Sequence, residues 1–295
     1  MTSWPRSNVA TPTEGPEVLE TLDAIADRLG DPRRWTFVFD FDGTLSELVD
    51  HPDDAGPVDG ARAAVAALGE VAEVALLSGR GVEDLVDRFG GAPDGVLLVG
   101  GHGSEAIWPD GRREPLADVG EVTEVLAAVA DELEAGLDAD AGWLVERKAA
   151  SVAVHHRRVA DAAVTEREPW VHERLAAVAD EGPGFEVLSG KAVVELRLRG
   201  VDKGRALRWL AERSAGRPPV VVGDDVTDEE AFAAAQDLGG FAVKVGDAGS
   251  ATVADARVAT PAEVVTLLHR VRSTGPTTPS AAQRAWTGRP VDSDG

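Results

Sequence analysis

The chain has 295 residues, 43% of them hydrophobic, and a formal net charge of −23. This composition allows a substantial buried core, whereas so acidic a surface argues against a protein that binds nucleic acid or anionic lipid. Cysteine is absent from the sequence, which excludes disulfides, thiolate metal sites and cysteine nucleophiles.

No apolar run in the sequence approaches the roughly 20 residues that a membrane-spanning helix needs. Residues 1–16 are polar and contain proline, and they do not resemble a secretion signal. We therefore expect a monomeric protein of the cytoplasm that has neither a membrane nor a nucleic acid as its partner. Flexible tails are expected over residues 1–16 and 273–295.

Strands and helices alternate along the first hundred residues. Short runs of apolar, β-forming residues predict buried strands at 35–39, 71–77 and 96–99. Helical spacing of apolar residues predicts helices at 17–30, 59–69 and 82–89. This alternation is typical of a parallel sheet with right-handed crossovers, in which ligands bind beyond the carboxyl ends of the strands.

The middle of the chain has a different pattern, with helices expected at 120–137 and 161–180 and strands at 143–148, 151–157, 185–188 and 192–198. We predict that residues 107–199 form a smaller α+β domain, the cap. It would be inserted into a parallel-sheet core formed by residues 17–106 and 200–272. The last part of this core is expected to contain strands at 219–222 and 241–245, and helices at 202–214, 227–236 and 261–271.

Two aspartates follow the first predicted strand. Asp40 and Asp42 are two residues apart, so their side chains point to the same side of an extended chain. Gly43 then permits a tight turn, and Thr44 offers a hydroxyl. Neighbouring carboxylates repel each other unless a cation lies between them. Because Mg²⁺ prefers oxygen ligands and also binds phosphate, this sequence predicts a magnesium-dependent phosphate site.

Three further groups of polar residues are expected at the same edge of the sheet. Asp224, Asp225 and Asp228 follow another buried strand, and they exceed what a helix cap requires. Ser78 stands at a helix start, where a hydroxyl and exposed amides can bind phosphate. Lys203 begins a helix, which is unfavourable for a cation unless the lysine neutralises an anion.

These four groups resemble, in order and spacing, the four motifs of the haloacid dehalogenase-like phosphatase superfamily. The resemblance implies that Asp40 is the nucleophile, which forms an aspartyl-phosphate, and that Asp42 is the general acid and base. It also implies that Mg²⁺ is held by Asp40, the backbone carbonyl of Asp42 and Asp224, with Asp225 and Asp228 as supporting residues.

The same resemblance assigns roles to the remaining residues of this edge. Ser78 and Lys203 would bind the phosphoryl oxygens, and Thr44 would belong to the substrate site. The fold that it implies is α/β, with a Rossmann-like parallel-sheet core of haloacid dehalogenase type and the α+β cap inserted into it.

Substrate choice is expected to lie in the predicted cap. On its first pair of strands, alternation can place Glu146 and Lys148 on one face, and Ser151 and His155 follow the same rhythm. By pattern alone, a solvated sheet face is the more common explanation of such polar residues. A resemblance of this segment to a known family therefore carries more weight than the alternation itself.

The pattern E-x-K-x-x-S-x-x-x-H-x-R, which begins at Glu146, resembles the cap signature of trehalose-6-phosphate phosphatases. Other matches to that family are Gly101-His102-Gly103, Val194-Glu195, Asp202-Lys203-Gly204 and Gly223-Asp224-Asp225. One departure is Leu198-Arg199, where the family usually has proline; it affects fine substrate geometry and leaves the chemistry unchanged. The resemblance implies sugar contacts from Glu146, Lys148, Ser151, His155 and Glu195. It also implies that His102 and Arg80, which would lie between the domains, bind the substrate.

The implied reaction is magnesium-dependent hydrolysis of trehalose 6-phosphate to trehalose and phosphate. One alternative is a phosphatase of another sugar phosphate, such as sucrose phosphate or a glucosylglycerate phosphate. Another is a phosphomutase, whose phosphoryl acceptor is a sugar and not water. A third is a non-catalytic partner of a trehalose-phosphate synthase, but the intact Asp40, Asp42, Lys203 and Asp224 argue against it.

Overall fold

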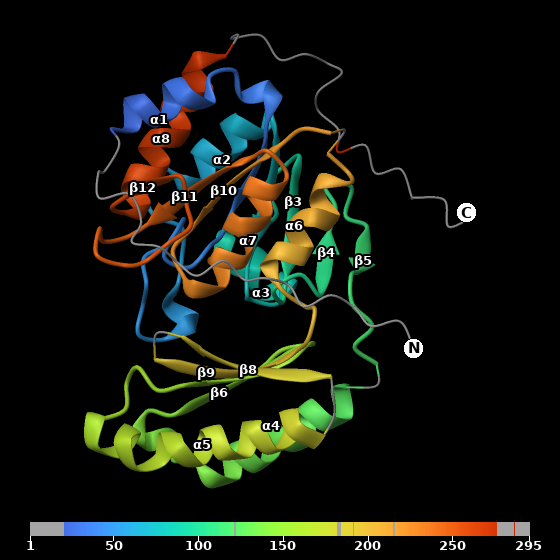
Figure 1. Cartoon of the computed structure of the whole chain (residues 1–295), viewed down its shortest axis with the longest axis vertical. Coiled ribbons are helices and arrows are strands. Elements are labelled where there is room, and N and C mark those ends of the chain that lie inside the picture. The colour runs from blue at the N-terminus through green and yellow to red at the C-terminus, as the bar shows by residue number, and fades with distance from the viewer. Residues whose placement is uncertain are drawn as a thin grey trace, which may run out of the picture.

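The computed structural model describes residues 21–120, 122–181, 184–190, 192–214, 216–275 and Trp286. Figure 1 shows a larger body built around one sheet and, beneath it, a smaller body in which a second sheet lies on two helices. We call the larger body the core and the smaller one the cap. Among the helices described, none has the length and apolar character that crossing a bilayer requires.

The core sheet has the strand order β12-β11-β10-β1-β2-β3-β4-β5. The strands from β12 to β3 run parallel, and β4 and β5 add an antiparallel hairpin at one edge. The bounds are β1 (Thr36–Phe39), β2 (Glu73–Leu77), β3 (Val96–Gly100), β4 (Glu105–Ile107), β5 (Arg113–Pro115), β10 (Pro219–Gly223), β11 (Phe241–Val245) and β12 (Ala256–Val258).

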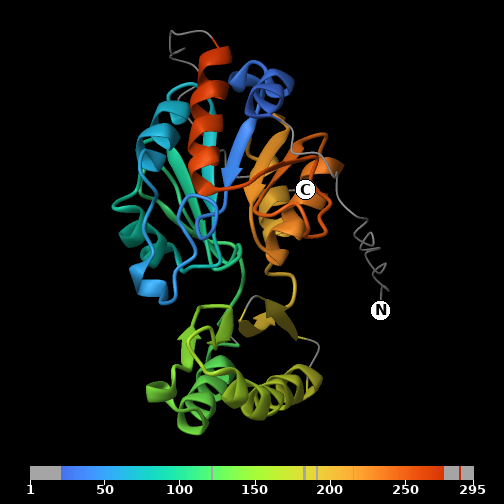
Figure 2. The same ribbon diagram turned by 90° about the vertical axis from the view of Figure 1, so that its left-hand side faces the viewer.

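Helices cover both faces of this sheet (Figure 2). Phe37 and Phe39 of β1 point to one face, where they share a hydrophobic cluster with α1 (Leu22–Leu29), α2 (Ala61–Gly69), α3 (Val82–Phe89) and α8 (Pro261–Thr274). Val38 points to the other face and clusters with α6 (Lys203–Ala211) and α7 (Val226–Asp237). The run of buried residues in β1 therefore reflects a strand that is covered on both sides.

The strand order reverses at β1, which places the ends of two distant segments side by side. In the register of the sheet, Val38 lies between Ala75 of β2 and Val221 of β10. The amide of Asp40, just after β1, donates to the carbonyl of Val222 over 2.9 Å. Asp40 and Asp224 therefore emerge together at the edge where parallel sheets bind their ligands.

The cap sheet is antiparallel, with the order β6-β7-β9-β8. Val152 and Val154 of β7 pack toward the two cap helices, so Ser151, Ala153 and His155 point to the opposite face, which faces the core (Figure 1). The cap elements are α4 (Thr123–Gly136), β6 (Leu144–Arg147), β7 (Ser151–His155), α5 (Asp161–Glu181), β8 (Phe185–Gly190) and β9 (Val193–Leu198).

Three strands were not predicted: β4, β5 and β12. Each is three residues long, too short to show an alternation in the sequence. The predicted start of the cap at residue 107 is also too early, because it divides a hairpin of the core sheet in which Ile107 pairs with Arg113. The side chain of Trp108 confirms this correction, since it packs in the core cluster around Val38.

The predicted flexible tail from residue 273 is wrong at three described positions, Ser273, Thr274 and Trp286. Helix α8 continues to Thr274, and the side chain of Trp286 is only 8% exposed. The indole of Trp286 packs edge-on against Trp108, with ring centroids 6.3 Å apart, and its Nε1 donates to the carbonyl of Val74 over 3.3 Å. The predicted tail over residues 1–16 lies outside the described residues.

We expect Trp286→Ala to lower the free energy of unfolding by about 3 kcal/mol, the lower end for truncating a buried tryptophan. The loss arises because the space beside Trp108 empties and the carbonyl of Val74 loses a donor. Urea unfolding followed by circular dichroism measures it. Val125→Ala is the control, since Val125 is 40% exposed and such surface changes stay within about 0.5 kcal/mol.

Candidate active site

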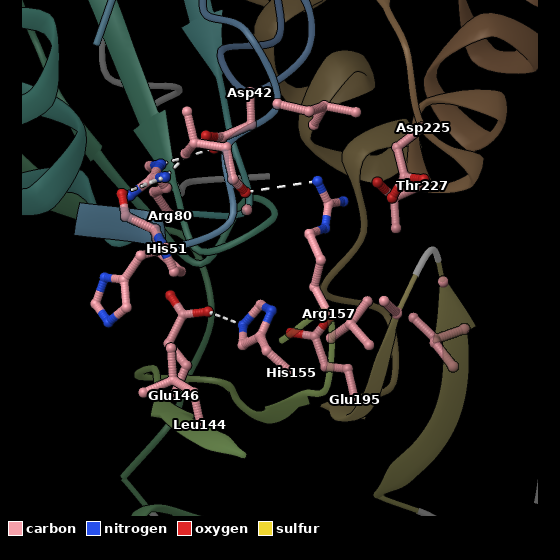
Figure 3. Close-up of a pocket in the computed structure, with 18 of the residues that line it drawn as sticks. Asp42, His51, Arg80, Leu144, Glu146, His155, Arg157, Glu195, Asp225 and Thr227 are labelled. Carbon is pink, nitrogen blue, oxygen red and sulfur yellow. Dashed lines mark hydrogen bonds and ion pairs between the residues drawn. The ribbon is translucent and has the colours of Figure 1, made fainter. Parts of the chain in front are cut away.

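A cavity of about 490 Å³ lies between the core and the cap, within the size range of small-molecule sites. Figure 3 shows that core side chains approach it from above and cap side chains from below. The predicted site residues that line it are Asp40, Asp42, Arg80, His102, Glu146, Lys148, His155, Glu195, Lys203, Asp224 and Asp225.

Three buried carboxylates meet at the core side of the cavity. Carboxylate oxygens of Asp40, Asp224 and Asp228 all lie within 4.8 Å of one another. The loop after β1 can approach so closely because Gly43 has φ +75° and no side chain; a Cβ there would lie 2.3 Å from the carboxylate carbon of Asp224. The glycine of the D-x-D-G-T-L sequence therefore brings the two strand ends together.

Asp228 is held by three N–H donors. Its Oδ1 accepts from Nζ of Lys203 over 2.7 Å, and its Oδ2 accepts from the backbone amides of Asp224 and Asp225 over 3.0 and 2.9 Å. Because both oxygens are engaged, Asp228 is suited to orienting the loop at the start of α7. Asp40 and Asp224 are then the carboxylates best placed to hold a cation.

Lys203, the first residue of α6, is buried between two of these carboxylates. Its Nζ lies 2.7 Å from Oδ1 of Asp40 and 2.7 Å from Oδ1 of Asp228. Burial by itself would lower the pKa of Lys203, but Asp228 and Asp40 raise it above its ordinary value. The lysine therefore stays charged at neutral pH.

The cluster has more negative than positive charge. Burial raises the pKa of Asp40 well above its ordinary value; Lys203 opposes this shift, whereas the carboxylates of Asp228 and Asp224 add to it. Three carboxylates and one ammonium leave a formal charge of −2 in a buried space. A divalent cation with oxygen ligands matches this charge and the chemistry of the donors.

Thr44 and Ser78 are buried but do not line the cavity. The hydroxyl of Thr44 has no hydrogen-bond partner among the described residues. The Oγ of Ser78 accepts from the amide of Arg80 over 3.2 Å. The predicted contacts of these two hydroxyls with the substrate thus remain predictions, because this arrangement places neither of them on the cavity wall.

The carboxylate of Asp42 is not part of the three-carboxylate cluster. It turns toward Arg80, whose Nε and Nη2 donate to its two oxygens over 2.7 and 2.8 Å (Figure 3). A contact of Asp42 with a metal would therefore have to come from its backbone, as the family resemblance implied. Its side chain, 33% exposed, faces the cavity.

The cap side of the cavity has its own cluster of charged residues. In the register of the cap sheet, Ala153 lies between Glu146 of β6 and Glu195 of β9, so the two carboxylates flank a small side chain. Nζ of Lys148 lies 3.4 Å from Glu146 and 3.5 Å from Glu195. The predicted alternation is confirmed, and these residues face the core and not bulk solvent.

Ser151 and His155 hold the two carboxylates in place. The hydroxyl of Ser151, which is buried and does not line the cavity, donates to Oε1 of Glu195 over 2.5 Å. Nε2 of His155 lies 2.8 Å from Oε2 of Glu146 (Figure 3). Burial alone would raise the pKa of Glu195, but Lys148 and His102 hold it well below its ordinary value.

His102 is the core residue that approaches this cap cluster. It follows β3 in a left-handed conformation, with φ 55°, and its Nε2 lies 3.4 Å from Oε2 of Glu195. The ring packs over Gly79, where a Cβ would lie 2.6 Å from a ring carbon. The predicted place of His102 between the domains agrees with this geometry.

A comparison with protein families gives the arrangement a context. Residues 38–260 match the family model described as trehalose-phosphatase. The chain belongs to this family. It is 38% identical to the trehalose-phosphate phosphatase of Mycobacterium leprae over 248 residues, which are 79% of this chain and 55% of that protein. It is also 39% identical to an uncharacterized glycosyl hydrolase of Mycobacterium tuberculosis over 76% of this chain and 17% of that protein. The chain thus spans about half or less of the length of these two relatives.

Solved structures of the trehalose-phosphatase family share the fold. The C-terminal domain of the Candida albicans trehalose-6-phosphate phosphatase superposes with a TM-score of 0.74 and 24% identity, covering 90% of this chain and 99% of that one. A trehalose-6-phosphate phosphatase related protein gives a TM-score of 0.67 and 26% identity, covering 81% of this chain and 97% of that one. The predicted haloacid dehalogenase-type core with an inserted α+β cap is confirmed.

Two arginines of this trehalose-phosphatase family member connect the core and the cap and were not among the predicted site residues. Arg157 reaches from the cap across the cavity, with Nη1 3.5 Å from the carbonyl of Val49 in the core (Figure 3). Arg197 of β9 is 1% exposed and bridges Glu186 of the cap and Glu230 of α7 over 2.8 and 2.9 Å. Arg157 ends the cap pattern that begins at Glu146, but the cross-domain partners of both arginines depend on the fold.

We expect Glu146→Gln to lower the free energy of unfolding at neutral pH but not in strong acid. Burial would raise the pKa of Glu146, but Lys148 and His155 lower it from 4.5 to about 2. A depressed pKa means that the carboxylate stabilises the fold above pH 4.5, and that this contribution disappears as the pH falls toward 2. Urea unfolding of the wild type and of Glu146→Gln should show that the difference between their free energies of unfolding decreases from pH 7 to pH 3. A difference that stays constant over this range would contradict the prediction.

Proposed function

We propose that this protein hydrolyses trehalose 6-phosphate to trehalose and inorganic phosphate, with Mg²⁺ as cofactor and an aspartyl-phosphate on Asp40 as intermediate. The observation that carries the proposal is one cavity with two chemically different walls. The core wall has buried carboxylates and Lys203, which suit a phosphoryl group and a divalent cation. The cap wall has Glu146, Lys148 and Glu195, which suit hydroxyl groups.

The chemistry follows from the position of each side chain at the core wall. A carboxylate oxygen of Asp40 forms a bond to phosphorus while the bond from phosphorus to the sugar oxygen breaks, and Asp42 gives that oxygen a proton. Asp42 then accepts a proton from the water that hydrolyses the aspartyl-phosphate. Lys203 neutralises charge on the phosphoryl oxygens throughout, which is most of what catalysis of phosphoryl transfer requires.

Asp40 and Asp224 are the residues that would hold the divalent cation, with Asp228 and Asp225 shaping the loop that carries Asp224. The fit rests on the charge of −2 in the buried cluster and on its all-oxygen donor set. When bound, the cation would neutralise part of the negative charge of these carboxylates and of the substrate's phosphoryl group.

The cap wall accounts for recognition of a sugar. Carboxylates accept hydrogen bonds from hydroxyl groups, and an ammonium donates to them. Glu146 and Glu195 already have Lys148 between them, so the cluster is preorganised before a sugar arrives. The names of the relatives in Mycobacterium leprae and Candida albicans favour trehalose 6-phosphate as the sugar phosphate.

The decisive experiment is release of inorganic phosphate from trehalose 6-phosphate, with Mg²⁺ and with EDTA. We expect turnover with Mg²⁺, loss to background with EDTA, and recovery when Mg²⁺ is restored. Mg²⁺ should also raise the midpoint of thermal unfolding, because it relieves the repulsion among Asp40, Asp224 and Asp228. Activity that is unaffected by EDTA would contradict the assignment of the metal.

The substrate is tested on a panel that contains trehalose 6-phosphate, sucrose 6-phosphate and a glucosylglycerate phosphate. We expect kcat/KM to be at least tenfold higher for trehalose 6-phosphate, which corresponds to about 1.4 kcal/mol of discrimination. Preference for another ester would contradict the proposed substrate but would leave the proposed phosphatase mechanism unchanged. Transfer of phosphate to a sugar without release of inorganic phosphate would show a phosphomutase.

A further inference from the structure

Arg80 is the residue whose observed contacts differ most from its predicted role in binding the substrate. It lies after β2, and its backbone is fixed against the end of β3: its carbonyl accepts from the amide of Gly101 over 2.7 Å. Gly100 allows this approach, because a Cβ there would lie 2.9 Å from the carbonyl oxygen of Arg80. The side chain therefore starts from a rigid position.

The guanidinium of Arg80 has almost all of its donors engaged within the core. Nε and Nη2 donate to the two oxygens of Asp42, Nη2 also donates to the carbonyl of Pro52 over 3.0 Å, and Nη1 donates to Asp84 over 2.6 Å. Four of the five N–H groups of an arginine are thereby used. The guanidinium also lies over Phe41, 5.7 Å from the ring centroid.

Further charges hold Arg80 in this orientation. Asp84 of α3 accepts from Nε of Arg88 over 3.0 Å, and Nη2 of Arg88 donates to Asp53 over 2.6 Å. Asp42, Arg80, Asp84, Arg88 and Asp53 thus form a ladder of alternating charges. It connects the edge of the cavity to α3 and to the loop around Asp53.

A two-point contact fixes the plane of a carboxylate as well as its position. Each oxygen of Asp42 uses one lone pair for Arg80 and keeps another for a proton, so proton transfer does not require the pair to break. Arg80, 7% exposed, has its fork directed at Asp42 and away from the cap cluster that would bind the sugar.

We propose that Arg80 is a positioning residue for Asp42 and not a ligand of the sugar. It holds the Asp42 carboxylate in the plane from which a proton passes to the leaving sugar oxygen and is later taken from water. This inference rests on the proposed function, and it assigns Arg80 to the proton-transfer step of that reaction.

A double-mutant cycle tests the proposal, with phosphate release from trehalose 6-phosphate measured for the wild type, Arg80→Met, Asp42→Asn and the double variant. General acid–base catalysis contributes about 10²- to 10⁴-fold, so Asp42→Asn leaves a measurable rate. We expect Arg80→Met to lower kcat about 10- to 100-fold with KM changed less than about threefold, because it acts through that step. In the Asp42→Asn background, the same substitution should change kcat less than about threefold.

Lys148→Met is the matched control, because Lys148 is also a cation of the cavity, with a side chain only 10% exposed, and the ion pairs of its Nζ among the described residues are with the cap carboxylates. Lys148→Met should raise KM, and the increase should be the same in the wild type and in the Asp42→Asn background. Equal losses from Arg80→Met in both backgrounds, or a loss confined to KM, would overturn the proposal and return Arg80 to the sugar site.

If Arg80→Met does not fold, Arg80→Lys takes its place in the cycle, since it keeps the charge and loses the two-point contact. If the enzyme prefers another phosphomonoester of the panel, the proposed substrate fails, and the cycle run on that ester still decides the role of Arg80. If no ester is hydrolysed, the proposed function and this inference fail together.

Discussion

Asp40→Asn should abolish phosphate release, with kcat at least about 10⁴-fold lower, as for other residues that form a covalent intermediate. An amide cannot attack phosphorus, and it is a poor ligand for a divalent cation beside Asp224. The fold should persist. Burial raises the pKa of Asp40, so the ionised carboxylate is costly at neutral pH, and a neutral amide of the same shape should leave the unfolding midpoint unchanged or higher.

Asp59→Asn is the matched control for this substitution, because Asp59 is exposed and does not line the cavity. It should leave both kcat and stability unchanged. Phosphate release and thermal unfolding are measured on the same preparations. Turnover retained by Asp40→Asn at more than about one hundredth of the wild-type rate would contradict the assignment of the nucleophile, since only loss of an indirect interaction produces so small an effect.

Lys203→Met should lower kcat/KM by about 10³-fold and the free energy of unfolding by about 3 kcal/mol, because it removes the partner of two buried carboxylates. Asp40 and Asp228 would then face each other without the ammonium that lies 2.7 Å from each. Mg²⁺ should restore part of the stability and little of the activity, since a cation can balance the carboxylates but cannot replace the lost contact with phosphate.

The other lysine of the cavity, Lys148, provides the control for Lys203→Met. With p-nitrophenyl phosphate, which has no sugar, Lys148→Met should keep the wild-type kcat/KM. The kcat/KM of Lys203→Met should be as strongly reduced with this ester as with trehalose 6-phosphate. With trehalose 6-phosphate, both substitutions should lower kcat/KM. Equal kcat/KM values of the two variants with p-nitrophenyl phosphate would contradict the proposal that the core wall binds the phosphate and the cap wall binds the sugar.

Much of the core could be predicted from sequence because its signals are local. The strand at β1 is a run of apolar residues buried on both faces, and its end is followed directly by Asp40 and Gly43. Parallel strands bring their carboxyl ends to one edge, so the approach of Asp224 to Asp40 follows from the alternation of strands and helices. The cap strands were predictable for the same reason, since Glu146 and Ser151 lie in alternating segments.

The features that could not be predicted depend on contacts between distant segments. The β4–β5 hairpin is too short for a periodic signal, and the burial of Trp286 requires the cluster that contains Trp108. The contacts of Arg80 also differ from its predicted role, and those of Arg197 were not predicted, because an arginine's partner depends on which carboxylate the fold places within reach. Sequence spacing identifies the charged groups near a site, and tertiary structure decides how they pair.

The bridge from Arg197 to Glu230 has a consequence for engineering. Arg197 lies on the last cap strand, two residues after Glu195, and the chain then reaches Lys203 at the start of α6. A chimera that exchanges caps between relatives would therefore replace Arg197 together with the cap, whereas its partner Glu230 would stay on α7 of the core. Such grafts should succeed only when the donor cap and the recipient core bring a matched arginine and glutamate, whatever sugar the new cap recognises.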